Sequence, residues 1–196
     1  MSEQMALNNS RQSARAFRVI MDTMARPGKV STLPRLIEPS EPAYATSLTV
    51  LLSLGDHLTS IYLAEEFRKA EIEKALRFHT GSQLVHEQAP ADFAVLNALH
   101  AEHALELWKR GTPEYPDQSA SLIIQTTSLT QGEAVEFSGP GIETKTTVHI
   151  ANITPTFWQA RAEANAVIPL GIDLIFVTPH DILCCPRSTR VTVGGA

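Results

Sequence analysis

The sequence feature that most constrains the fold is a nearly unbroken apolar run near the end of the chain, at residues 168–177. A Pro and a Gly open this run, and a single acid, Asp173, interrupts it. Such a run, bounded by turn residues, is typical of a strand that is buried on both faces of a sheet. Asp173 at the start of such a strand is either a cap for backbone groups or a functional group.

The rest of the chain alternates helical and extended patterns, which predicts an α/β fold with a mixed sheet flanked by helices. In the first helix, Phe17, Ile20, Met21 and Met24 share one face, and Pro27-Gly28 ends it. We expect helices at 12–24, 44–52, 65–76, 98–108 and 155–165, and strands at 60–64, 77–80, 91–96, 121–126, 134–138, 144–150, within 168–177 and at 182–185, with 121–126 and 134–138 paired as a hairpin.

The length of 196 residues favours a single domain over residues 1–196, with a flexible lead over residues 1–12. The net charge is −5 and the basic residues are scattered, which argues against nucleic-acid binding. No secretory signal is visible, and no apolar run approaches the ~20 residues that cross a membrane. Adjacent Cys184 and Cys185 would point to opposite faces of a strand, so no disulfide framework follows. We therefore expect a cytoplasmic protein that contacts no membrane.

Several common chemistries lack their motifs in this sequence. No Gly-rich segment ends in Gly-Lys-Ser or Gly-Lys-Thr, and Gly139-Pro140-Gly141 is interpreted as a turn between strands. His100 and His103 have no further ligands at suitable spacing, so we expect no metal site. None of the five lysines lies in an apolar stretch that would favour a Schiff base, so we expect no cofactor.

Five polar residues are candidates for anion binding, for acid–base chemistry or for purely structural roles: Arg26, His79, Asp173, Arg187 and Arg190. Arg26 follows a helix, where it complements the helix dipole or meets an anion. His79 ends an expected strand, as an acid, a base or a hydrogen-bonded structural residue. Arg187 and Arg190 suit phosphate or carboxylate oxygens, but on an extended segment they face opposite sides. No base, nucleophile or metal converges on Asp173, so we expect it to pair with an arginine or to cap backbone amides.

Six blocks, in order along the chain, resemble the PhnH family, the H subunit of the bacterial phosphonate carbon–phosphorus lyase system. They cover residues 17 to 191, and although each is short, their order makes the likeness specific. The blocks are Phe17-Arg18-x-x-Met21-x-x-Met24-Ala25-Arg26-Pro27-Gly28, Leu76-Arg77-Phe78-His79-Thr80, Ala91-Asp92-Phe93-Ala94, Gly139-Pro140-Gly141-Ile142, Pro169-Leu170-Gly171-Ile172-Asp173-Leu174 and Pro186-Arg187-Ser188-Thr189-Arg190-Val191.

The resemblance implies a subunit of the carbon–phosphorus lyase core complex, in which partner subunits join a phosphonate to the ribose of ATP and displace adenine. It implies a fold like the large domain of pyridoxal-phosphate (PLP)-dependent transferases, without PLP, and a homodimer in isolation. It supplies no established catalytic residue. The main hypothesis is therefore an accessory subunit that is not catalytic alone.

Two other hypotheses stay open. The first is a stand-alone enzyme or binding protein for a small anionic phosphonate or nucleotide, with Arg187 and Arg190 as clamps and Asp173 or His79 as acid or base. The second is a PLP enzyme, which would bind its coloured cofactor on a lysine.

Overall fold

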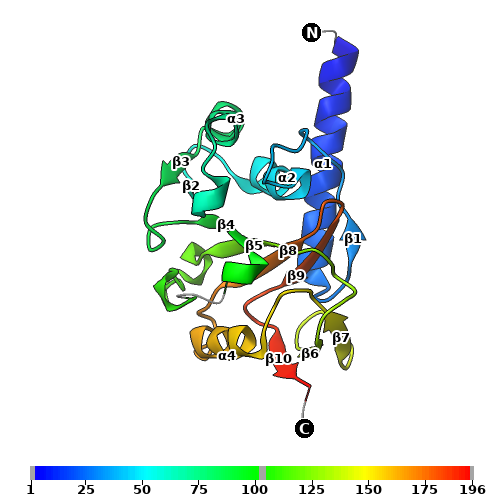
Figure 1. Cartoon of the computed structure of the whole chain (residues 1–196), viewed down its shortest axis with the longest axis vertical. Helices are drawn as coiled ribbons and strands as arrows, with labels where there is room; N and C mark the ends of the chain where they lie inside the picture. The colour runs from blue at the N-terminus through cyan, green and yellow to red at the C-terminus, as the bar shows by residue number, and fades with distance from the viewer. Residues whose placement is uncertain (1–2, 102–104, 195–196) are drawn as a thin grey trace.

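The protein is described by a computed structural model that covers residues 3–101 and 105–194, with side-chain environments from Ser10 onward. A seven-stranded sheet forms the middle layer, with α1, α2 and α3 on one face and α4 with a three-stranded sheet on the other (Figure 1). The helices are α1 Glu3–Ala25, α2 Ala45–Leu54, α3 Ala70–Thr80 and α4 Pro155–Ala164, with short 3₁₀ helices at Glu65–Phe67, Ala98–His100, Leu105–Leu107 and Pro116–Gln118. The strands are β1 Ser31–Thr32, β2 Ser60–Leu63, β3 Gln83–Val85, β4 Phe93–Asn97, β5 Ser121–Gln125, β6 Ala134–Ser138, β7 Thr146–His149, β8 Asp173–Val177, β9 Asp181–Cys185 and β10 Arg190–Val193.

The large sheet confirms the expectation of a mixed α/β fold with a doubly buried strand. Its order is β1-β9-β8-β5-β4-β2-β3, in which β8, β5, β4, β2 and β3 run parallel and β9 runs antiparallel to β8 and β1. All residues of β8 are buried. Alternate strand residues enter two hydrophobic clusters, Phe176 on the α4 side and Ile175 on the α1 side, because successive side chains point to opposite faces. Cys184 and Cys185 divide between the clusters in the same way.

The expected hairpin of residues 121–126 and 134–138 is wrong. β5 lies between β4 and β8, so neither of its edges is free for β6. β6 instead lies between β10 and β7 in the small antiparallel sheet. Their burial differs accordingly: all but the first residue of β5 are buried, whereas β6 buries only Val135 and Phe137.

The expected strand at residues 77–80 is also wrong, because α3 continues through Thr80. Gly81, at φ 72°, closes the helix by donating its N–H to the carbonyl of Arg77. The expected helix at 65–76 is divided into the 3₁₀ turn Glu65–Phe67 and α3. His79 therefore lies in the last turn of a helix and not at the end of a strand.

The expected helix at 98–108 is replaced, in its described part, by two 3₁₀ turns, and His103 lies outside the described residues. Asn97 starts the first turn by accepting a hydrogen bond from Leu99 N–H. Ala101, Leu105 and Trp108 are buried, so apolar residues whose spacing suits a helix are buried here by 3₁₀ turns and irregular backbone.

Helix α1 begins at Glu3, well before the expected start at Gln12. It therefore includes most of residues 1–12, the segment expected as a flexible lead.

Two of the glycine-containing blocks touch each other. Gly141 has φ +82°, and a Cβ at this position would overlap the carbonyl oxygen of Ala25 at the end of α1. Only glycine allows this approach without strain. The turn between β6 and β7 of the small sheet is thereby packed against the end of the first helix.

Candidate functional site

The Asp173–Arg187 pair forms where β8 begins and the chain leaves β9. We call this side of the sheet, at the amino ends of its parallel strands, the amino edge, and the opposite side the carboxyl edge. Because β8 and β9 are antiparallel neighbours, the first residue of β8 lies beside the segment that follows Cys185. Asp173 Oδ1 accepts hydrogen bonds from the backbone N–H of Arg187 at 2.7 Å and from its Nε at 3.2 Å, and Oδ2 accepts from Nη2 at 2.5 Å. Asp173 thus pairs with an arginine and caps a backbone amide at once, the two structural roles that the sequence left as alternatives.

Helix α4 holds both halves of this pair in place. Arg161 is 2% exposed and donates from Nη1 to the carbonyl of Thr189 at 2.6 Å and from Nη2 to that of Pro186 at 2.8 Å. Asn165 donates from Nδ2 to the carbonyls of Ile172 and Arg187, and its Oδ1 accepts from Ile172 N–H. In the sequence, Arg161 is spaced to share one side of a helix with Phe157 and Trp158, and this cation on an apolar face was the signal that could have revealed its role.

A second acid, Asp92, stands at the same edge, just before β4. Ser60 donates to Asp92 Oδ2 from its backbone N–H and its hydroxyl, both at 2.7 Å, and Lys109 Nζ lies 2.5 Å from Oδ1. Burial works to raise the pKa of Asp92, but the hydrogen bonds from Lys109 and Ser60 leave it below its ordinary value. Register places Phe93 opposite Ser121 and Ser121 opposite Asp173, so Asp92, just before β4, and Asp173, at the start of β8, lie along one edge.

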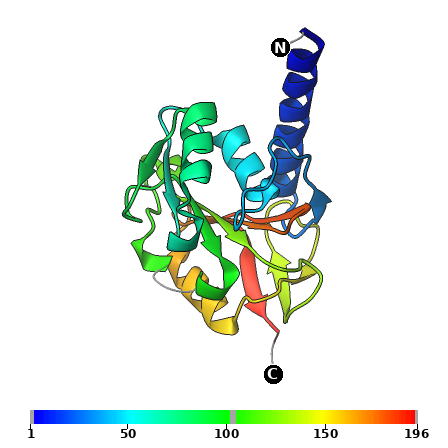
Figure 2. The same ribbon diagram turned by 45° about the horizontal axis from the view of Figure 1, so that its top comes forward.

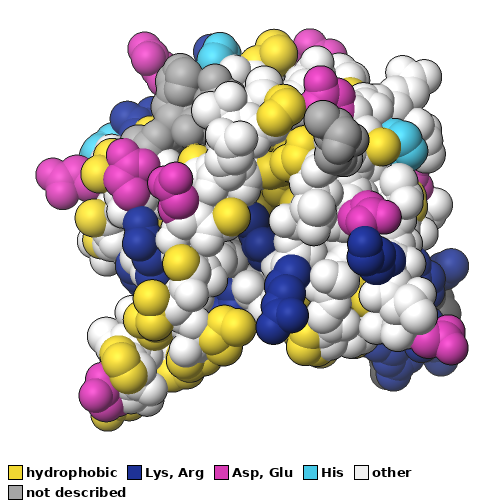
Figure 3. Space-filling model, turned by 90° about the horizontal axis from the view of Figure 1, so that it is seen from below, with side chains coloured by type: hydrophobic (Ala, Val, Ile, Leu, Met, Phe, Trp, Pro, Cys, Tyr) yellow, Lys and Arg dark blue, Asp and Glu magenta, His cyan; other side chains and the backbone are white. Residues whose placement is uncertain are grey.

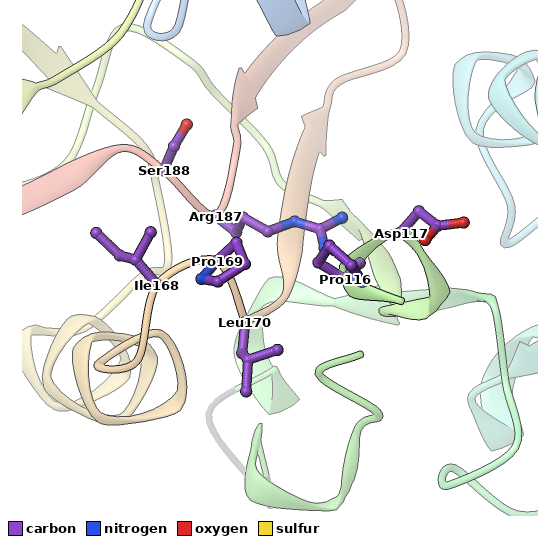
Figure 4. Close-up of a pocket in the computed structure, with 7 residues that line it drawn as sticks. All are labelled: Pro116, Asp117, Ile168, Pro169, Leu170, Arg187 and Ser188. Carbon is purple, nitrogen blue, oxygen red and sulfur yellow. The ribbon is translucent and has the colours of Figure 1, made fainter. Parts of the chain in front are cut away.

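A cavity of about 360 Å³ opens beside the Asp173–Arg187 pair. Its lining is mostly apolar and consists of Pro116, Asp117, Ile168, Pro169, Leu170, Arg187 and Ser188. In Figure 4 the Arg187 side chain runs from beside Pro169 toward Pro116, while the Asp117 carboxylate and the Ser188 hydroxyl point away from it. The volume is at the lower end of those that bind small molecules, roughly 300–1,000 Å³.

The charge on Arg187 is already compensated. Its Nε and Nη2 donate to Asp173 and its Nη1 donates to the carbonyl of Pro116. Arg190 begins β10 with an exposed side chain, opposite Ser138. The cavity therefore suits an uncharged apolar group better than a phosphonate or phosphate. The face seen from below in Figure 3 carries acidic and basic side chains interspersed with hydrophobic ones.

The other two candidates lie elsewhere. Arg26 is exposed just after α1 and pairs with Asp22 at 3.2 Å. His79 is exposed on α3 and lines a separate hollow of about 250 Å³ with Gln12, Ser13, Leu36 and Leu52. Of the five candidates, the structure brings together only Asp173 and Arg187.

The carboxyl edge of the same sheet is filled by an uncharged network around Gln125, the last residue of β5. Gln125 Oε1 accepts from Tyr44 N–H at 2.7 Å and from the Ser47 hydroxyl at 2.6 Å, and its Nε2 donates to the carbonyl of Pro42 at 3.1 Å. Beside it, the Thr46 hydroxyl donates to the carbonyl of Thr178 at 2.5 Å. Sequence reasoning missed this network, and a Gln at the end of an apolar strand was its only signal.

Reactive groups are scarce in the part of the chain that the structure describes. Burial raises the pKa of the Cys184 thiol to about 12 and that of Cys185 to about 11, so both stay protonated at neutral pH. Among the described residues, no three His, Cys, Asp or Glu side chains are grouped as metal ligands. Lys29, Lys109 and Lys145 are in ion pairs, and Lys69 and Lys74 are exposed. No described helix is long and apolar enough to span a membrane.

The fold and the site together define a class: an α/β protein in which an acid and an arginine, Asp173 and Arg187, are paired at the edge of a mixed sheet. The sequence model of one bacterial family, described as "Bacterial phosphonate metabolism protein (PhnH)", matches residues 6–192. The chain belongs to this family.

Two relatives extend the likeness over most of the chain. One is the "Alpha-D-ribose 1-methylphosphonate 5-triphosphate synthase subunit PhnH" of Rhizobium meliloti (strain 1021), 31% identical over 175 residues, which are 89% of this chain and 88% of the relative. The other is the "Putative C-P lyase subunit protein HtxG" of Stutzerimonas stutzeri, 30% identical over 182 residues, which are 92% of this chain and 86% of the relative.

Proposed function

We propose that this chain is a subunit of a bacterial carbon–phosphorus lyase complex and that its own contribution is structural. With partner subunits it would support the transfer of the ribose triphosphate moiety of ATP to a phosphonate, with displacement of adenine. Membership of the PhnH family and the printed names of the two relatives support the assignment to the complex. The relation of the fold to the large domain of PLP-dependent transferases stays a prediction, as do the homodimer and the cytoplasmic location.

The observation that carries the structural role is the closed bonding of the Asp173–Arg187 pair. An acid or base for catalysis needs hydrogen-bond access to its substrate. Both oxygens of Asp173 accept from Arg187, and Asp173 is 6% exposed. This bonding disfavours the alternative in which Arg187 and Arg190 clamp an anion while Asp173 moves a proton.

Reconstitution from purified subunits tests the proposal. The other subunits of the complex are incubated with ATP and methylphosphonate, with and without this chain, and released adenine is measured by chromatography. We expect adenine only when this chain is present with its partners, and none from this chain alone. A mixture that works unchanged without it would refute the accessory role, and adenine release by the isolated chain would make it an enzyme.

A double variant separates a structural role for Asp173 from a chemical one. Asp173→Asn with Arg187→Met removes both charges and keeps similar volumes, so the folded double variant should still support adenine release. Loss of activity in a double variant that folds and joins the complex would assign Asp173 or Arg187 to the chemistry. Sedimentation of the isolated chain tests the proposed homodimer.

A further inference from the structure

Helix α1 has a wider apolar face than the body of the protein covers. Phe17, Ile20, Met21 and Met24 share the predicted face, yet Phe17 is 46% exposed and Met21 is 45% exposed. From Ser10 onward, the fully buried residues of α1 are Ala16, Ile20 and Thr23, at 0% exposure each. The buried face is therefore rotated around the helix axis from the predicted apolar face. Phe17 and Met21, four residues apart, form an uncovered apolar stripe.

The same helix stands clear of the rest of the fold. α1 extends beyond α2 and α3, and its N-terminal part projects away from the sheet (Figures 1 and 2). Residues 10–15 are all exposed, and burial begins at Ala16. Both the apolar stripe and its flanks are thus open to a partner.

An arginine stripe runs along the exposed helix beside the apolar one. Arg11, Arg15 and Arg18 are exposed and spaced to share one face, whose centre lies about 90° around the axis from Met21 at 3.6 residues per turn. Within the described part of the chain, no acidic side chain is in ion-pair contact with any of the three. The nearby acid Asp22 instead forms ion pairs with Arg26 and Lys29.

The charges decide which partner fits this surface. In a contact between the α1 helices of two copies, two arginine stripes would be brought together and would repel each other. A surface helix that binds a lipid bilayer needs a broad apolar face, whereas here the apolar face is divided between the core and the exposed stripe. A protein surface with an apolar groove and acidic side chains on its rim would match both the apolar stripe and the arginine stripe.

We propose that α1 is a docking helix that places Phe17 and Met21 in an apolar groove of another subunit, with Asp or Glu side chains on the rim of that groove meeting Arg11, Arg15 and Arg18. This proposal rests on the proposed membership of a multi-subunit complex. The apolar side chains supply the anchors of a helix-in-groove interface, and the arginines supply orientation and the rate of encounter.

The binding of this chain to the co-purified remaining subunits tests the proposal, measured by biolayer interferometry at low and high salt. Phe17→Gln with Met21→Gln should weaken binding at least about tenfold, since buried apolar anchors dominate interface energies. Reversal of Arg11, Arg15 and Arg18 to Glu should weaken binding at low salt by about tenfold or more, and added salt should then no longer weaken binding, because it screens a repulsion from the acidic rim.

Matched variants on other elements serve as controls. Leu58→Gln with Phe78→Gln changes two apolar residues that are 79% and 82% exposed, and Lys69→Glu with Lys74→Glu and Arg77→Glu reverses three exposed cations around α3. Both controls should bind within about twofold of the wild type, because isolated surface changes have small effects. Unchanged circular dichroism spectra show that every variant is folded.

Each other outcome overturns the proposal. If the α1 variants bind like the wild type, another surface docks. If they lose only self-association in sedimentation, α1 is an interface between copies of this chain. If they lose only binding to phosphatidylserine vesicles, α1 contacts lipid. If the wild type binds none of the subunits, the proposed function fails as well. Failure of the docking proposal alone would show as binding by the wild type that the α1 variants retain.

Discussion

The amino edge and the carboxyl edge of the large sheet are stabilised by different kinds of interaction. At the amino edge, Asp92 and Asp173 are each paired with a cation, Lys109 and Arg187. At the carboxyl edge, the groups that meet at Gln125 are amides, hydroxyls and backbone carbonyls. The difference teaches where this protein departs from other α/β folds. In such folds the ligand usually binds outside the carboxyl ends of the parallel strands, but at the end of β5 Gln125 and the start of α2 fill that place here.

The largest expected effect comes from breaking the charged edge. Asp173→Asn leaves Arg187, whose side chain is 21% exposed, without a counter-charge. We expect a loss of about 3–5 kcal/mol in the free energy of unfolding, the usual cost of removing one partner from a buried pair. Urea denaturation measures it.

The double variant with Asp173→Asn and Arg187→Met is the control for this prediction. It should recover most of the loss, because replacement of both members of a buried pair by uncharged groups is often nearly neutral. An Asp173→Asn protein as stable as the wild type would show that the pair contributes nothing, and the two edges would then no longer differ in this respect.

A smaller effect is expected at the uncharged edge. Gln125→Met keeps the volume but leaves Tyr44 N–H, the Ser47 hydroxyl and the Pro42 carbonyl without their partner. We expect a loss of about 2 kcal/mol, since buried polar groups left unpaired cost about 1–3 kcal/mol. Gln131→Met, at an exposed position, is the matched control and should change stability little. A larger loss than that of Asp173→Asn would reverse the ranking of the edges.

Acid should separate the edges further. The pKa of Asp92 is lowered in the folded protein, so its contribution is present above the unfolded pKa and is lost as pH falls through the lower folded value. The deficit of Asp92→Asn should be about 1 kcal/mol near neutral pH, as for a partly exposed pair, and should shrink below about pH 4. The deficit of Gln125→Met should not change over this range. Urea unfolding at several pH values compares the two.

The smallest signal is thiol labelling of the folded wild type. Cys184 and Cys185 are fully buried, so an aromatic disulfide reagent should label both only on unfolding. Cys185 immediately precedes the Pro186–Arg187 segment, so Asp173→Asn should speed its labelling through local opening. Gln125→Met should have little effect on this rate in native conditions. Equal acceleration by both variants would mean that labelling follows global unfolding and not opening of one edge.

Strong local patterns were predictable from the sequence. The apolar run of β8, the start of α4 at Pro155 and the mixed α/β class all follow from residue order and turn chemistry. Local patterns could not show which sheet a strand joins, so β5 and β6 were wrongly paired. They also could not separate Arg77–Thr80 from a short strand, because the αL cap at Gly81 decides the helix end through backbone conformation.

The site was only half visible in the sequence. Asp173 could be expected to need an arginine or a backbone amide, because a charge in a buried strand must be compensated. Its partner, Arg187, is determined by the β8–β9 return, which brings residues 14 apart together. The contributions of Arg161 and Gln125 depend on carbonyls distant in sequence, and no local signal specifies a carbonyl acceptor.

The pairing of β1 with β9 has a consequence for how the protein is made. Ser31 lies opposite Ile182, the Thr32 hydroxyl bonds to Asp181 across 149 residues, and Gly28 N–H donates to the carbonyl of Cys184. A chain that emerges from the ribosome N-terminus first therefore holds its earliest helix without its sheet partner until synthesis is almost complete. α2 can cover part of α1 early, but the part of α1 that packs against β9, where Thr23 accepts a hydrogen bond from the Cys184 thiol, stays uncovered throughout this interval. A prematurely terminated chain would therefore expose this part of the helix to chaperones and proteases.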